Sequence, residues 1–99
     1  MTAPDAAAAR TLARALVDER LIACANLVPG VTSIYRWEGR VEEAGEVLVV
    51  MKTRAALVPR LLARAAALHP YEVPELLALP VDDGLAAYCR WVAEETDGA

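Results

Sequence analysis

The amino-acid sequence predicts a small α+β domain in which helices cover one face of an antiparallel sheet. Three observations support this fold class: apolar side chains recur with helical spacing over the first twenty residues, residues 22–54 read as extended strands, and two later stretches return to helical spacing. Because 99 residues suffice for only one modest core, we expect residues 1–99 to form a single domain.

The first predicted element is a helix over residues 5–20. Ala8, Leu12 and Leu16 recur every four residues and mark its buried side, while charged residues follow a second stripe. Pro4 directly precedes the run, which suits a helix start because proline has no amide hydrogen to leave unpaired there.

Two extended segments follow and predict an antiparallel hairpin. The first, "IACANLVPGVTSIYRWEG", is broken by a Pro29–Gly30 turn, and alternate residues from Val31 to Trp37 share one face. The second, "EVLVVMKTR", follows a turn-rich connection over residues 39–45.

The run "VLVVM" in the second strand is apolar at every position, so both of its faces require burial. Two helices in a domain of this size can cover only one side of a sheet. The economical cover for the other side is a further copy of the chain, and the sequence therefore predicts an oligomer.

A second helix is predicted from near Val58 to near Leu68, where Pro70 ends it. "ELLALPV" then predicts a short apolar strand ending at Pro80, and a last helix is expected over residues 84–95. This order is that of a ferredoxin-like β-α-β-β-α-β sandwich with its first strand missing or truncated and an extra C-terminal helix. Either the protein starts upstream or another segment fills the gap; we favour the first explanation.

The composition argues against several classes of protein. Fourteen acidic and ten basic residues are dispersed, which disfavours nucleic-acid partners, and no apolar run approaches the roughly 20 residues of a membrane span. Cys24 and Cys89 are far apart and form no CxxC pair, and the N-terminal stretch lacks a secretory pattern. We therefore expect a cytoplasmic protein with reduced, buried thiols.

His69 is the only histidine, and its chemistry allows a metal ligand, a general base or a hydrogen-bonded corner residue. Catalysis would need a nucleophile beside His69 and a third group to orient its ring, and the neighbouring sequence offers no such set. The HExxH and GxSxG patterns are also absent. We therefore expect no enzyme. The other soft metal ligands, Cys24, Cys89 and the weaker Met51, are not spaced as a local site.

Three blocks of the sequence resemble the CutA family of divalent-cation tolerance proteins: "ALVDERLIACANLVPGVTSIYRWEG", "VEEAGEVLVVMKTR" and "LHPYEVPELLALPVDDGLAAYCRWV". The resemblance extends from Thr2 to about Thr96. It implies a ferredoxin-like subunit in a homotrimer, related in architecture to PII-like signalling proteins, which bind small ligands in clefts between subunits. The family's name implies a role in metal tolerance, with copper binding attributed to some members and no established reaction.

The copper site proposed for that family uses a cysteine at the end of the first strand and two adjacent histidines before a "PY" motif. In this chain His69 matches the second histidine, Leu68 occupies the first position, and the cysteine position falls near Met1.

Two leading hypotheses follow. The first is a trimeric binding or signalling module for a small molecule or an ion, with an inter-subunit cleft lined by Tyr35, Trp37, Lys52, His69, Tyr71 and Glu75. The second is a protein that binds copper or another divalent cation directly through His69, with Cys24 or Met51. An enzyme acting through His69 or Lys52 and a structural scaffold are the remaining alternatives.

Overall fold

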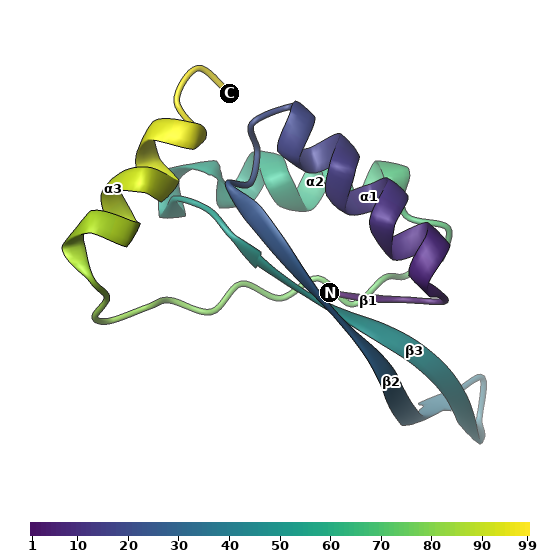
Figure 1. The fold of residues 1–99 in the computed structure, drawn as a ribbon. Helices are drawn as coiled ribbons and strands as arrows, with labels where there is room; N and C mark the ends of the chain where they lie inside the picture. The colour runs from purple at the N-terminus through teal and green to yellow at the C-terminus, as the bar shows by residue number, and fades with distance from the viewer.

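A computed structural model describes residues 1–99 and contains a three-stranded antiparallel sheet with α1 and α2 on one of its faces (Figure 1). The strands lie in the order β1-β3-β2. The elements are β1 (Thr2–Ala3), α1 (Ala6–Asp18), β2 (Cys24–Trp37), β3 (Arg40–Lys52), a 3-10 turn (Ala55–Leu57), α2 (Val58–Leu68) and α3 (Ala86–Glu95). None of the helices is long and apolar enough to cross a membrane.

The first predicted helix is confirmed as α1, one or two residues shorter at each end. The Asp5 carboxylate caps it by accepting a hydrogen bond from the Ala8 amide at 2.8 Å, and Arg20 follows it with a positive φ of 60°. Leu12 and Leu16 are buried as expected. The predicted helix from Val58 to Leu68 is α2.

The two faces of β3 are covered very differently. Val47 and Val49 are buried under the helices, whereas Leu48 is half-buried and Val50 is 44% exposed on the other face. The prediction that the chain's own helices cover only one side of the sheet is therefore confirmed.

The connection between β2 and β3 is tighter than the sequence suggested. Residues 39–45 do not form a turn region; β3 begins at Arg40, directly opposite Trp37. The turn consists of Glu38 and Gly39 alone, with φ values of 48° and 79°. Positive φ at both central residues matches the twist of the two strands, and this explains the two-residue connection.

The Pro29–Gly30 pair forms a β-bulge within β2, so the predicted turn at this position is wrong. Val28 pairs with Leu48 and Val31 pairs with Glu46, which leaves both bulge residues opposite the single residue Val47. Gly30 has a φ of +78°, a conformation that glycine adopts without steric cost.

The predicted first strand is present in truncated form, and the predicted last strand is not formed. The first strand is not missing but truncated to Thr2–Ala3, which pairs with β3. The strand predicted at residues 75–81 is not formed, and Leu77, Leu79 and Val81 are 78–85% exposed. A two-residue β1 offers almost no edge for pairing, and the flanking prolines lack amide hydrogens.

The C-terminal helix α3 lies at the opposite end of the molecule from the hairpin tip (Figure 1). Arg54 holds its end, donating from Nε to the Thr96 hydroxyl at 2.9 Å and from Nη2 to the Thr96 carbonyl at 2.8 Å. Val92 of this helix is buried, whereas Tyr88, and Leu85 just before the helix, are exposed.

We predict that Gly30→Ala lowers the free energy of unfolding by about 1 kcal/mol, because an alanine side chain is strained at this positive φ although the space around it is open. Gly45→Ala is the matched control: it also meets open space in the same hairpin but without a positive φ, so its effect should stay within about 0.5 kcal/mol. Urea unfolding at one fixed protein concentration measures both. Equal effects would contradict the strain argument.

Candidate functional site

A cavity of about 680 Å³ lies between the β2–β3 hairpin and the segment that follows α2. We call it the hairpin cleft. Its eleven lining residues come from β1, the distal hairpin and residues 70–75. The side chains with aromatic rings or charges are Tyr35, Trp37, Glu46, Tyr71, Glu72 and Glu75.

The bulge determines that the hairpin's aromatic residues reach this cleft. Before the bulge, Leu27 pairs with the buried Val49 and packs against the core. After it, Val31 pairs with Glu46, so alternate residues from Val31 to Trp37 share the Glu46 face of β3. Tyr35 and Trp37 therefore lie on the face of the sheet opposite the helices.

His69 forms the corner that brings the chain from α2 to the cleft. Its backbone is extended, at φ −70° and ψ 139°, as a residue before proline requires. The ring, 7% exposed, uses both nitrogens: Nε2–H donates to the Thr2 carbonyl at 2.8 Å, and Nδ1 accepts from the Tyr71 amide at 3.0 Å. These partners fix the tautomer, because a carbonyl only accepts and an amide only donates.

The same contacts bear on metal binding by His69. Neither ring nitrogen has a free lone pair for a metal ion in this tautomer. Nowhere in the chain do three or more His, Cys, Asp or Glu side chains gather in a way that could hold a metal ion. The side chains of a single chain thus do not fit a copper site at His69.

Tyr71 connects the corner to the sheet. Its hydroxyl donates to Glu46 Oε2 at 2.9 Å, and its ring lies 4.8 Å from the imidazole of His69. Burial raises the pKa of Tyr71 to about 12, and the hydrogen bond and negative charge of Glu46 act in the same direction. Tyr71 therefore stays protonated at neutral pH.

Four of the six residues expected to share a cleft do so: Tyr35, Trp37, Tyr71 and Glu75. Lys52 lies at the far end of the hairpin, where Nζ donates to Asn26 Oδ1 and the Val50 carbonyl. His69 is a neighbour of the cleft but does not line it.

Two carboxylates of the cleft, Glu46 and Glu72, were not among the residues predicted to line it. Glu46 would have been found from the register, since a two-residue turn at Glu38–Gly39 with one bulge places it opposite Val31. Glu72 carried no such signal, because its position depends on the path of the chain after Pro70.

The two thiols are less buried than expected. Cys24 is half-buried and its Sγ lies 3.3 Å from the Tyr88 hydroxyl, within hydrogen-bonding distance, while Cys89 is exposed. The prediction that both are small buried hydrophobes is therefore wrong, because α3 leaves its Cys89 face uncovered.

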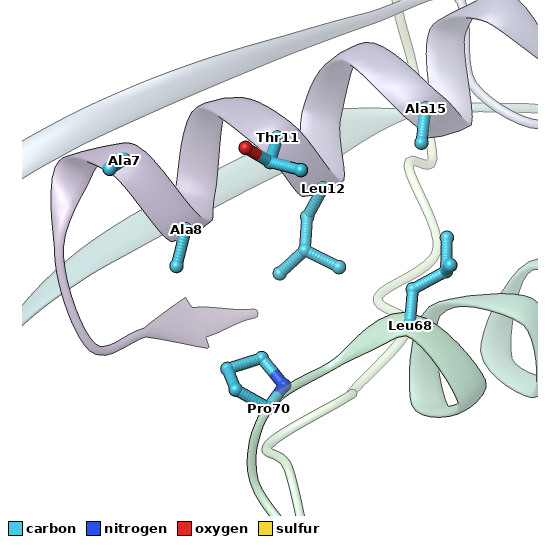
Figure 2. Close-up of a pocket in the computed structure, with 7 residues that line it drawn as sticks. All are labelled: Ala7, Ala8, Thr11, Leu12, Ala15, Leu68 and Pro70. Carbon is cyan, nitrogen blue, oxygen red and sulfur yellow. The ribbon is translucent and has the colours of Figure 1, made fainter.

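A second cavity, of about 330 Å³, lies between α1 and the end of α2 (Figure 2). Leu12, Leu68 and Pro70 point towards this space, and alanines form most of the remaining wall. Thr11 is the one polar side chain that lines it. Without an ionisable group, this cavity offers little chemistry, and the hairpin cleft is the stronger site.

Comparison with known proteins gives consistent relatives. A family model described as CutA1 divalent ion tolerance protein matches residues 1–95. Divalent-cation tolerance protein CutA of Thermus thermophilus is 52% identical over 96 residues, which cover 97% of this chain and 93% of that protein. Protein CutA of Mus musculus is 47% identical over 98% of this chain, which spans 55% of the mouse protein's length.

The fold matches as well. The crystal structure of CutA from Xylella fastidiosa superposes with a TM-score of 0.94 at 43% sequence identity, over 97% of this chain and 92% of that chain. The small α+β architecture with its three-stranded sheet is therefore that of the CutA1 structures.

We predict that Glu46→Gln lowers the pKa of Tyr71 from about 12 while leaving it above 10, because the carboxylate is removed but burial remains. Ultraviolet titration of tyrosinate measures this, and Tyr71→Phe identifies the band. Glu43→Gln, on the opposite side of β3, is the control.

The raised pKa of Tyr71 also predicts that the stability of the fold depends on pH. The folded state holds this proton more tightly than the unfolded chain, so the stabilisation is complete below pH 10 and is lost as the pH rises through about 12. An unchanged titration in Glu46→Gln would contradict the assigned role of the carboxylate.

Proposed function

This chain belongs to the CutA1 divalent ion tolerance family, and on that premise we propose that it acts in the response to divalent cations as a homotrimeric, PII-like module that binds a small ligand or an ion. The observation that supports this most is the hairpin cleft. Residues from two distant segments, Tyr35 and Trp37 on one side and Tyr71 and Glu75 on the other, surround one cavity of ligand size.

The uncovered surface of the subunit supports self-association. No residue of the fourteen in β2 is buried, although the strand carries Val28 and Ile34. Leu77, Leu79 and Val81 project from an extended segment that has no strand partner. Apolar surface of this kind together with unpaired strand edges favours pairing between copies of the chain.

The position of the leucines supports a cleft at a subunit boundary. The exposed leucines begin two residues after Glu75, so a second copy that covers Leu77 and Leu79 would also border the hairpin cleft. A contribution from Lys52 of another copy to the same cleft, and a cytoplasmic location, stay predictions.

Direct copper binding through His69 is the alternative. The name of the Thermus thermophilus relative supports divalent-cation tolerance, and neither that name nor the name of the mouse relative states an enzyme activity. The two hydrogen bonds of the His69 ring favour a structural role over a ligand role. We therefore propose the cleft, and not His69, as the binding site.

Native mass spectrometry should show a species at three times the 10.6 kDa of one subunit. Leu79→Glu should dissociate it, because each of the equivalent contacts would bury a charge in place of a leucine worth about 2 kcal/mol. Ala63→Glu, a matched change on the exposed side of α2, should leave the trimer intact. A monomeric wild-type protein would refute the proposal.

Adding a small excess of copper to the same sample separates the two functions. We expect His69→Ala to leave any copper uptake unchanged and to lower the free energy of unfolding by about 2 kcal/mol, because two buried hydrogen bonds are lost. Stoichiometric copper uptake that disappears in His69→Ala would instead establish the copper-binding alternative.

A further inference from the structure

Aromatic side chains from two segments of the chain line the hairpin cleft. Tyr35 and Trp37 are 43% and 45% exposed, and Tyr71 enters from the opposite side. Val73 adds apolar surface to the same cleft. Aromatic faces carry a negative quadrupole that attracts cations within about 6 Å of the ring centre, while aliphatic surface accepts a hydrocarbon group.

The charge of the cleft has one sign. Glu46, Glu72 and Glu75 line it, and none of its eleven residues is basic. None of these carboxylates is in an ion pair. Arg40, the cross-strand partner of Trp37, is not among the lining residues. The carboxylates therefore keep their charge uncompensated, in a concave site that concentrates the negative potential.

We propose that the hairpin cleft selects a small organic cation, an ammonium or guanidinium group attached to a hydrocarbon or aromatic body. This proposal rests on the proposed function, because the proposed function assigns ligand binding to the hairpin cleft. The cation would lie against Tyr35 and Trp37 with Glu72 and Glu75 neutralising its charge, while its body packs on the apolar wall.

The arrangement fits an organic cation better than a bare metal ion. A hard divalent ion requires about six oxygen ligands at close range, and the carboxylates of the cleft are not gathered in that way. An organic cation is weakly hydrated, needs no fixed coordination shell and gains from the rings. A volume of about 680 Å³ also leaves room for its body.

Three probes that share one ring test the charge: benzylammonium, benzyl alcohol and benzoate. Isothermal titration with the full chain at neutral pH should give a dissociation constant for benzylammonium at least about tenfold lower than for benzyl alcohol, with benzoate the weakest. Equal affinities, tighter binding of benzoate, or no saturable binding of benzylammonium would overturn the proposal.

Neutral variants locate the binding. The double variant Glu72→Gln, Glu75→Gln keeps side-chain shape, and both positions are exposed, so folding should be preserved. It should lower the affinity for benzylammonium several-fold, towards the affinity for benzyl alcohol. Trp37→Leu should lower the affinity for all three probes. Glu94→Gln on α3 is the matched control and should change nothing. Selectivity that survives in the double variant would overturn the site.

The oligomeric state distinguishes this inference from the proposed function. A monomer that still prefers benzylammonium would refute the trimeric assembly and support the cation site. A trimer that shows no preference would keep the assembly and overturn the cation site. A trimer that excludes all probes, while dissociated Leu79→Glu subunits bind benzylammonium, would show that another copy fills the cleft and would also overturn the proposal.

Discussion

The Pro29–Gly30 bulge is the constraint on which the arrangement of this molecule depends. It lets one strand contribute to two faces of the sheet: Leu27 packs on the core beside Val49, whereas Tyr35 and Trp37, beyond the bulge, face away from the helices. In a continuous register, Tyr35 would share the face of Val49 instead. The bulge costs little conformational free energy because glycine occupies the position with positive φ.

A second constraint follows from the size of the core. The helices bury Val47 and Val49 but no residue from 24 to 46, so the distal hairpin is a two-stranded ribbon without a fully covered face. Residues 70–75 cover one face of this ribbon only in part, and such ribbons are marginally stable in water unless further surfaces pack on them. The exposed leucines after Glu75 provide further apolar surface. The small core of the chain therefore leaves apolar surface uncovered, and this favours assembly.

Local chemistry allowed much of the fold to be predicted from the sequence. The ends of α2 followed from proline stereochemistry, and α1 followed from its apolar spacing. The predictions that were wrong concern features that depend on pairing between distant residues. These features are the bulge, the tight Glu38–Gly39 turn and the absence of a strand at residues 75–81. For the same reason four cleft residues were anticipated from side-chain type, while Glu46 required the register.

The histidine that first suggested a metal site has a different consequence for binding. Its ring connects the Thr2 carbonyl to the Tyr71 amide, and the Tyr71 hydroxyl then holds Glu46. This series of hydrogen bonds joins β1, the segment after α2 and β3. It holds one wall of the cleft in place, which would lower the entropic cost of binding a ligand there. The exposed carboxylates of Glu72 and Glu75 keep their freedom to adjust. A hydrogen-bonded Tyr71 beside exposed carboxylates would suit ligands that share a charge but differ in shape.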